Sequence, residues 1–414
     1  MAETKRPKSC KIEDQMNLPV YMDHHATTPL DPGVLEAMLP FLREKFGNAA
    51  SCTHSYGWDA QAAVERARKQ VAGLIHAKPE EIIFTSGATE SDNLAIKGAA
   101  RANRQRGNHL VTLAIEHHAV LDACRRLEGE GFKVTYMPVN PDGVLSLKDF
   151  AQALTDQTIL ASVMAANNEI GTLEPIREIG KLCRERGILF HTDAVQAIGK
   201  IEMDVEAMSV DMLSISAHKI YGPKGVGALY VRQNDPRLNL TPLLDGGGHE
   251  RGLRSGTLNV PGIVGLGRAC EICRQKMPQE PDRLRALRDR LKAGILNGLD
   301  GVIINGSMDE RLPNNLNLSF AGVDAESFLM ALKDVALSSG SACNSAGDSP
   351  SYVLQALGLS GDVAASSIRF GLGRFNTEEE VDFAVERIIE TVKSLRELSS
   401  LPATANPKAT GHKA

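Results

Sequence analysis

From about Asp31 onwards, short apolar runs alternate with segments whose apolar residues recur at helical spacing. The apolar runs predict strands at 82–85, 109–114, 133–138, 159–164, 188–191, 212–216 and 227–231. The periodic segments predict helices at 60–76, 90–102, 120–129, 147–154, 176–186 and 265–277. This alternation is typical of a largely parallel sheet that is covered by helices on both faces and binds ligands at the carboxyl ends of its strands.

The pattern changes after Met277, where a charged segment begins. The remainder predicts helices at 282–299, from Ala325 and at 377–398, with strands near 302–305 and 316–320. We therefore expect a second, smaller α+β domain. The predicted division is an arm at 1–28 that associates with the small domain, a large domain at 29–277, a small domain at 278–398 and a disordered tail at 399–414.

Composition excludes several classes of protein. The 414 residues are 43% hydrophobic and 23% charged, which is enough apolar material for a large core and two domains. The net charge is −5 and no long basic run occurs, so we expect neither nucleic acid nor a membrane as a partner. Residues 1–20 lack the apolar core of a signal peptide, and no stretch is apolar enough to span a bilayer. A cytoplasmic protein is therefore expected.

The seven cysteines are an odd number, which favours reduced thiols over a disulfide framework. Cys270 and Cys273 form a C-x-x-C pair inside a predicted helix, and without a second Cys or His pair at matching spacing we expect no metal site. Cys343 differs because it lies among small polar residues between Ser338 and Gly347. A thiolate on such a loop, which we expect to be mobile, can travel between a buried cofactor and an outside acceptor.

One lysine, Lys219, lies between the apolar strand 212–216 and a glycine-rich turn that ends at Gly227. A lysine desolvated in this position can lose its proton and form a Schiff base with an aldehyde. The segment predicts pyridoxal 5'-phosphate tethered at Lys219, and the alternative is a surface lysine in a loop.

A strand, a glycine turn and the start of a helix follow one another at 82–94. The turn residue Gly87 permits close approach, and Ala88 and Thr89 present N–H groups at the positive end of a helix dipole, where phosphate binds. Thr89 and Asp92 have capping-box spacing, so an ordinary capped helix is the alternative.

Polar residues at the ends of three other predicted strands are candidates for contacts to the cofactor. Asp193 can pair with a pyridinium nitrogen and keep the ring an electron sink, although an isolated Asp after a strand is usually a helix cap. Gln196 can hydrogen-bond the phenolic oxygen of the ring, and Ser216 and His218 flank the lysine and can reach phosphate. One imidazole of the Glu116-His117-His118 run can stack on the ring and shuttle protons.

Near the carboxyl end of the chain, Arg369 offers a planar fork suited to a substrate carboxylate. A solvated or structural arginine is the alternative reading.

Together these segments resemble the cysteine desulfurases of the IscS and NifS types, which belong to the class-V aminotransferase-like, fold type I pyridoxal-phosphate enzymes. The resemblance runs from about Val20 to Leu398. The motifs that carry it are Asp23-His-His-Ala-Thr-Thr-Pro29, 85–93, Asn167-Asn-Glu-Ile-Gly171, 216–225, 246–251, Arg254-Ser-Gly-Thr257 and Ser341-Ala-Cys343. It implies an α/β fold with a large cofactor-binding domain, built on a mostly parallel mixed sheet, and a smaller α+β domain.

The resemblance also implies roles for individual residues. Lys219 is the Schiff-base lysine, His117 the stacking imidazole, and Cys343 the sulfur acceptor. The remaining contacts are Asp193 and Gln196 to the ring, Ala88, Thr89, Ser216 and His218 to the phosphate with Thr257 of the other subunit, and Asn168 and Arg369 to the substrate carboxylate. The implied protein is a homodimer that converts L-cysteine to alanine and passes a Cys343 persulfide to an acceptor such as an iron–sulfur scaffold.

Two features depart from the family pattern. His24 and His25 stand where members often have other residues, and the tail from Ser399 does not resemble the docking segment of members that serve a scaffold. The chain is expected to bind no metal of its own, although Cys343 is expected to share sulfur or a nascent iron–sulfur cluster with a scaffold partner. A selenocysteine lyase, a sulfur-relay protein with little turnover and a plain aminotransferase remain as alternatives.

Overall fold

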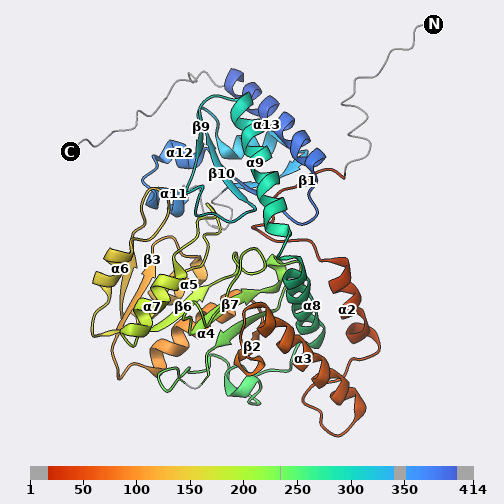
Figure 1. The fold of residues 1–414 in the computed structure, drawn as a ribbon, viewed down its shortest axis with the longest axis vertical. Helices are drawn as coiled ribbons and strands as arrows, with labels where there is room; N and C mark the ends of the chain where they lie inside the picture. Colours follow the sequence, from red (N-terminus) through yellow and green to blue (C-terminus); the bar gives the residue numbers. More distant parts are fainter. Residues whose placement is uncertain (1–16, 234, 340–350, 399–414) are drawn as a thin grey trace.

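The computed structural model describes residues 17–233, 235–339 and 351–398 (Figure 1). Cys343 and the tail at 399–414 lie outside the described residues. In Figure 1 the lower part is built on a seven-stranded sheet, and the upper part contains a four-stranded sheet with the long helices α9 and α13. The predicted α/β fold class is confirmed.

The seven-stranded sheet has the order β2-β8-β7-β6-β5-β3-β4. Its strands are β2 (Ile82–Thr85), β3 (His109–Leu113), β4 (Lys133–Met137), β5 (Thr158–Ser162), β6 (Leu189–Asp193), β7 (Met212–Ser216) and β8 (Gly227–Val231). All neighbouring strands are parallel except β8, which runs antiparallel to both β2 and β7. All seven predicted strands are therefore present. Asp193, expected just after a strand, is instead the last residue of β6.

Helices cover both faces of this sheet. They are α2 (Pro32–Arg43), α3 (Ser55–Leu74), α4 (Ala88–Ala102), α5 (His118–Glu128), α6 (Leu147–Ala153), α7 (Ile176–Glu185) and α8 (Val260–Lys276). Apolar residues of α4 and α5, among them Leu94 and Val120, pack on one face, and residues of α3 and α8, among them Val64 and Leu266, pack on the other. Because both faces are covered, β2, β3, β5, β6 and β7 are buried throughout.

Two local expectations were wrong or incomplete. The capping box at Thr89 and Asp92 does not form: α4 begins after Gly87, which has no side chain to cap it, and Glu90 turns back to accept a hydrogen bond from the Ser86 N–H. Helix α2 was not predicted, and Pro40 lies inside it, where a proline normally breaks a helix. Its first turn is fixed by Asp31, whose side chain accepts a hydrogen bond from the Gly33 N–H.

The second sheet is antiparallel, with the order β12-β13-β10-β9. Its strands are β9 (Val302–Ile304), β10 (Asn315–Phe320), β12 (Ser338–Ser339) and β13 (Ser367–Gly371). The helices of this region are α9 (Glu280–Gly298), α10 (Ala325–Ala331), α11 (Tyr352–Ala356), α12 (Gly361–Ala365) and α13 (Glu378–Leu398). The sequence did not predict β13, which carries Arg369 into the interior.

The amino-terminal segment crosses between the two sheets. Strand β1 (Val20–Tyr21) pairs in parallel with β11 (Val335–Ala336), and Val20 packs with the core of the four-stranded sheet. Residues of α11, in contrast, pack with the core of the seven-stranded sheet. The division into domains at 28 and 277 stays a prediction.

Candidate active site

A cavity of about 550 Å³ lies beyond the carboxyl ends of the parallel strands. It is lined by residues that follow β2, β3, β5, β6 and β7, together with part of the amino-terminal segment and Arg369 from β13. The predicted site residues that line it are Ala88, Thr89, His117, Asn168, Asp193, Gln196, Ser216, His218, Lys219 and Arg369. The fold therefore brings ten residues from six separate segments to one place.

One end of the cavity is suited to a phosphate. The first N–H groups of α4, at Ala88 and Thr89, have no acceptor within the helix, so they are available to an anion. Gly87 has a φ of 149° and space where a side chain would lie, which lets an anion approach the backbone. Lys224 also lines the cavity and adds positive charge.

His218 closes the same end of the cavity as a neutral group. Its Nδ1 lies 3.1 Å from Thr27 Oγ1. Burial, together with the charges of Lys219 and Lys224, lowers the pKa of His218 to about 4. Near neutral pH the imidazole can therefore offer a phosphate a hydrogen bond but not a charge.

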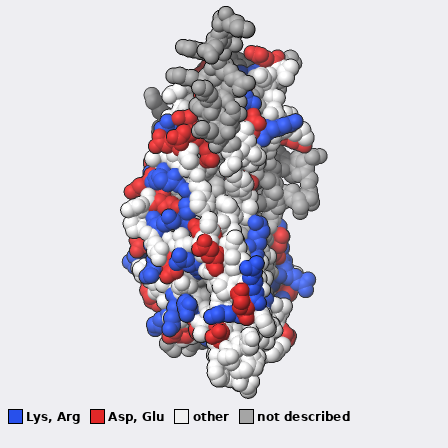
Figure 2. Space-filling model, turned by 90° about the vertical axis from the view of Figure 1, so that its right-hand side faces the viewer, with Lys and Arg blue, Asp and Glu red and all other residues white. Residues whose placement is uncertain are grey.

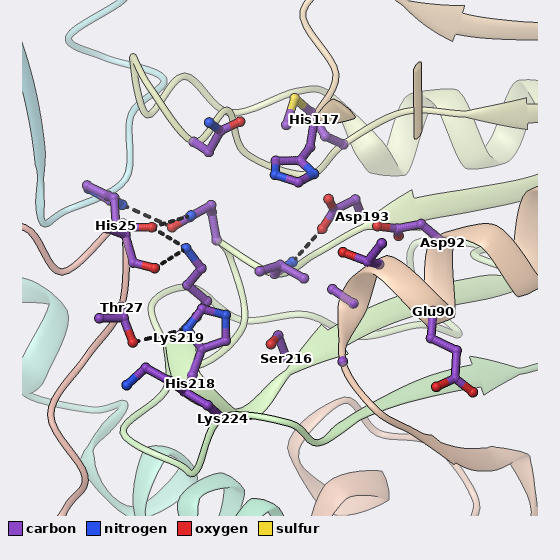
Figure 3. A pocket seen from close by; sticks show the side chains of 18 of the residues that line it. His25, Thr27, Glu90, Asp92, His117, Asp193, Ser216, His218, Lys219 and Lys224 are labelled. Carbon is purple, nitrogen blue, oxygen red and sulfur yellow. Dashed lines mark hydrogen bonds between the residues drawn. The ribbon is translucent and has the colours of Figure 1, made fainter. Parts of the chain in front are cut away.

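A cluster of buried carboxyls includes Asp92 and Asp193, which both line the cavity. The Val195 N–H donates to Asp193 Oδ1 at 2.9 Å, and Figure 3 shows Asp92 beside Asp193. Burial raises the pKa of Asp193, while His117 and Lys219 oppose that rise. Burial and the charge of Asp193 also raise the pKa values of Asp92 and Glu116. A cationic ring nitrogen beside Asp193 would supply the countercharge that favours its ionised form.

The imidazole of His117 lines the cavity and lies above Asp193 in the view of Figure 3. His117 is the N-cap of α5, and its Nδ1 accepts a hydrogen bond from the Ala119 N–H at 3.1 Å. The proton of the neutral ring therefore lies on Nε2. Burial lowers the pKa of His117, which keeps the ring neutral and suited to stacking on a flat cofactor.

Lys219 ends a short 3-10 turn, η2 (Ala217–Lys219), directly after β7. Its ammonium donates to the Ala26 carbonyl at 2.8 Å and also to the His25 carbonyl. The amino-terminal segment thus forms the wall that holds this lysine. His25, Ala26 and Thr27 of this segment line the cavity, although the sequence predicts no role for them beyond a family motif.

Arg369 is almost fully buried, at 1% exposure, and reaches the cavity from the other sheet. Its Nη1 donates to the Asn168 carbonyl at 3.0 Å, and its Nη2 donates to Asp23 Oδ1 at 2.9 Å and to Ser338 Oγ at 2.7 Å. Asp23, quoted above only as part of a family motif, is thus a direct partner of this arginine.

Several buried polar atoms of the cavity wall have no hydrogen-bond partner among the described residues. They are His25 Nε2, Asp92 Oδ1 and Oδ2, Asn168 Oδ1 and Arg369 Nε. Buried polar atoms in folded proteins are normally paired, so this concentration indicates a region built around a polar ligand. Pyridoxal phosphate has groups that suit these residues: the N–H groups at the start of α4 could hold its phosphate, Asp193 its ring nitrogen and Lys219 its aldehyde.

Of the two remaining predicted residues, the structure describes only Thr257. Thr257 is exposed and does not line the cavity, and Cys343 lies outside the described residues. Within the described ranges, no group of three or more His, Cys, Asp or Glu residues is placed to hold a metal ion. No helix in the described part of the chain is long and apolar enough to cross a membrane.

Fold and site together define a pyridoxal-phosphate enzyme of fold type I. The family of class-V aminotransferases matches residues 20–383. A cysteine desulfurase IscS of Anaeromyxobacter dehalogenans is 59% identical over 386 residues, which cover 93% of this chain and 95% of that protein. A human cysteine desulfurase is 58% identical over 383 residues, covering 92% of this chain and 84% of that one.

Solved structures agree. A NifS-like protein superposes with a TM-score of 0.85 at 40% identity, covering 91% of this chain and all of that one. A structure described as SspA in complex with cysteine gives a TM-score of 0.76 at 39% identity, covering 86% and 100%. The chain belongs to the class-V aminotransferase family, and within it to the pyridoxal-phosphate-dependent cysteine desulfurases. The resemblance read from the sequence motifs is confirmed.

Proposed function

We propose that this enzyme converts L-cysteine to L-alanine and carries the released sulfur as a persulfide on Cys343 for delivery to an acceptor protein. The observation that supports the proposal best is the meeting of Lys219, Asp193, the start of α4 and Arg369 around one cavity. Each of the four matches a different part of the cofactor or substrate, namely aldehyde, ring nitrogen, phosphate and carboxylate.

The proposed cofactor contacts follow from the chemistry of the donors. Backbone N–H groups of Ala88 and Thr89, with Ser216 and His218, hold the phosphate. Asp193 pairs with the ring nitrogen, and Gln196 lies where its amide can hydrogen-bond the phenolic oxygen. When bound, the cofactor supplies an electron sink for the pair left at the substrate Cα.

Arg369 and Asn168 orient the substrate in this proposal. Arg369 and Asn168 both line the cavity, and the Asn168 Oδ1 is buried without a partner among the described residues. A guanidinium N–H can donate to the substrate carboxylate. The pair would hold the amino acid so that its amine faces Lys219.

Lys219 is proposed to move the proton at the substrate Cα. Once its nitrogen is displaced by the substrate amine, it is a free base still held near the carbonyls of His25 and Ala26. His117, with its proton on Nε2, covers the cavity and excludes water from one side.

Sulfur transfer is assigned to Cys343. Its thiolate attacks the substrate sulfur, so that an S–S bond forms while the Cβ–S bond breaks. The electron pair of the broken bond stays with the substrate carbon, which takes up a proton to become alanine. Cys343 is left with one added sulfur, which an acceptor thiol can then remove.

A homodimer is proposed because an apolar surface lies on α2 and around the start of α3. Its exposed members are Leu35, Leu39, Leu42, Phe46, Tyr56 and Trp58. Figure 2 looks onto the side where α2 and α3 lie and shows an uncharged area at its lower end. An uncharged surface of this kind is typical of an interface. In the proposed dimer, Thr257 reaches the phosphate of the partner's site.

Leu39→Asp combined with Phe46→Asp tests the dimer. We expect the double variant to elute as a monomer in size-exclusion chromatography with light scattering. Leu398→Asp, a substitution of an apolar residue with 83% exposure at the end of α13, serves as the control and should leave the dimer intact. A dimeric double variant, or a monomeric unmodified enzyme, would contradict the proposed interface.

The acceptor is proposed to be an iron–sulfur scaffold or another thiol-bearing protein, and the location to be the cytoplasm. The described cysteines, Cys52, Cys124, Cys183, Cys270 and Cys273, are all free thiols, which suits a reducing compartment. Cell fractionation with an antibody to the chain tests the location, and recovery of the enzyme from a secreted or periplasmic fraction would contradict it.

The central experiment is mass spectrometry of the enzyme after exposure to L-cysteine. We expect one added sulfur on the peptide that contains Cys343, and alanine in solution. Cys343→Ala should keep the visible absorbance of the cofactor and its response to L-cysteine but lose sulfur transfer, while Cys52→Ala, which alters an exposed thiol, should behave as the unmodified enzyme. Full turnover by Cys343→Ala would refute the assignment.

A further inference from the structure

His25 holds Gln196 by two hydrogen bonds. The His25 Nδ1 lies 3.0 Å from Gln196 Oε1, and the Gln196 Nε2 donates to the His25 carbonyl at 3.1 Å. Both residues are buried, at 1% and 4% exposure, and both line the cavity. Figure 3 shows His25 beside Lys219, on the wall across from Asp193.

This pair of contacts fixes the protonation of the imidazole. The His25 carbonyl can only accept, so the Gln196 atom that faces it is the amide nitrogen. The other Gln196 atom, facing Nδ1, is then the oxygen, which needs a donor. The proton of a neutral His25 is therefore on Nδ1, and its Nε2 is an acceptor.

The acceptor, His25 Nε2, and a nearby donor, the Nε–H of Arg369, are both buried and lack a hydrogen-bond partner among the described residues. The two residues lie close to one another in the fold, because Gly371, two residues after Arg369 on β13, is so near that a side chain at this position would touch the His25 ring. Alternate residues of a strand face the same side, so the Arg369 side chain leaves β13 on the face where His25 packs.

The electrostatics agree with a neutral ring. Burial lowers the pKa of His25 well below its usual value, and the charges of Arg369, Lys200 and Lys219 lower it further, against the opposing effect of its hydrogen bond with Gln196. A neutral ring is favourable near the positive charge of Arg369, whereas a second proton on the ring would place two cations together.

We propose that His25 is a positioning residue that ties the residue contacting the cofactor ring, Gln196, to the residue contacting the substrate carboxylate, Arg369. Its Nδ1–H and carbonyl hold the Gln196 amide, and its Nε2 orients the Arg369 fork when the substrate carboxylate competes with Asp23 for that fork. This inference rests on the roles proposed above for Gln196 and Arg369.

Two substitutions separate the two contacts. In His25→Asn the amide nitrogen takes the place of Nδ1 and the Nε2 acceptor is lost. In His25→Gln an amide oxygen takes the place of Nε2 and the Nδ1 donor is lost. His24→Asn is the matched control, because His24 is equally buried, bonds the Gly371 carbonyl through Nδ1 and does not line the cavity.

The expected results differ between the variants. His25→Asn should raise the KM for L-cysteine about tenfold, the loss of one hydrogen bond, with kcat and the visible absorbance of the cofactor unchanged. His25→Gln should shift the absorbance maximum or its pH profile, because Gln196 is no longer held. His24→Asn should match the unmodified enzyme in all of these measurements. An unchanged KM in His25→Asn, or an unshifted spectrum in His25→Gln, would overturn the inference.

The tautomer can be tested without any substitution. Neutron diffraction of the holoenzyme should show hydrogen on Nδ1 of His25 and none on Nε2, and hydrogen on Nε2 would overturn the proposal even if the variants do not fold. If the unmodified enzyme failed to bind the cofactor or L-cysteine, the proposed function itself would fail. If it binds both and only the His25 results disagree, this inference alone fails.

Discussion

Two buried polar regions of this enzyme differ in how completely they are paired. In the first, Arg68 of α3 and Glu250 form two hydrogen bonds of 2.8 Å, Arg68 Nη1 also donates to the Ile82 carbonyl at 2.7 Å, and the Phe84 N–H donates to Glu250 Oε2 at 2.7 Å. Each nitrogen of the Arg68 guanidinium and each oxygen of the Glu250 carboxylate therefore has a hydrogen-bond partner. In the second, around the cavity, His25, Asn168 and Arg369 keep buried polar atoms that have no hydrogen-bond partner in the described part of the chain.

The difference separates a network that stabilises the fold from one that is suited to binding a ligand. A closed network fixes the strand that leads into α4 and has nothing left to offer a ligand. In the network around the cavity, each buried polar group without a partner costs about 1–3 kcal/mol of stability. A bound cofactor and substrate offset that cost when they supply the missing partners.

Removing the tether should have the largest effect. Lys219→Ala is expected to abolish the visible absorbance band of the bound aldehyde and to lower alanine production by roughly 10²–10⁴-fold, the range for a lost positioned proton-transfer group. Absorbance spectra and an alanine assay measure this. Lys181→Ala removes an exposed lysine of α7 and should change neither. A retained absorbance band in Lys219→Ala would contradict the assignment.

Breaking the closed network should damage stability. Arg68→Ala leaves Glu250 buried without its partner, so we expect a loss of about 3–5 kcal/mol in the free energy of unfolding. Urea denaturation measures it. Replacing both partners, as Arg68→Met with Glu250→Leu, should recover much of that loss, because no unpaired charge then remains. If the double variant were less stable than Arg68→Ala, the network would stabilise by more than pairing.

Glu174 is an incompletely paired carboxyl outside the cavity. Its Oε2 accepts from the Leu145 N–H at 2.9 Å, its Oε1 has no partner in the described part of the chain, and burial raises its pKa to about 7. Between the unfolded value of 4.5 and about 7 the folded protein binds more protons than the unfolded one, so this group makes stability fall as pH rises through that window. Above it, the penalty is constant at roughly 3 kcal/mol.

Glu174→Gln keeps an oxygen for Leu145 and removes the titration. We expect the variant to be more stable than the unmodified enzyme at pH 8 and to lose part of the decline between pH 5 and 7, as measured by urea unfolding across pH. Glu178→Gln, on the first turn of α7, gives the control profile. An identical pH dependence in Glu174→Gln and the unmodified enzyme would show that this carboxyl does not titrate as described.

Exposed ion pairs should matter least. Arg125 and Asp122 pair at 2.6 Å on α5 with both side chains more than half exposed. Water already solvates both groups, so Arg125→Ala should change the free energy of unfolding by less than about 1 kcal/mol. A loss comparable to that of Arg68→Ala would remove the distinction between buried and exposed pairs drawn here.

Features encoded by consecutive residues could be predicted from the sequence, and features that depend on distant segments could not. The turn after Thr85 and the lysine after β7 are encoded by a few consecutive residues, and both were predicted. The start of α4 was found, but its capping was not, because the backbone freedom of Gly87 and the reach of Glu90 decide it. Strand β13 was missed because its apolar run is short and its burial comes from distant segments.

The alternating α/β framework, the lysine after β7, the glycine turn before α4 and the family of the chain could all be predicted from the sequence, because periodicity and motifs lie within short stretches of chain. The packing of distant segments places His25 in the cavity wall and brings Asp23 to Arg369. Their contacts with Gln196 and Arg369 span 171 and 346 residues. Contacts over such separations leave no local pattern, since they arise from how the amino-terminal segment and the two sheets pack together.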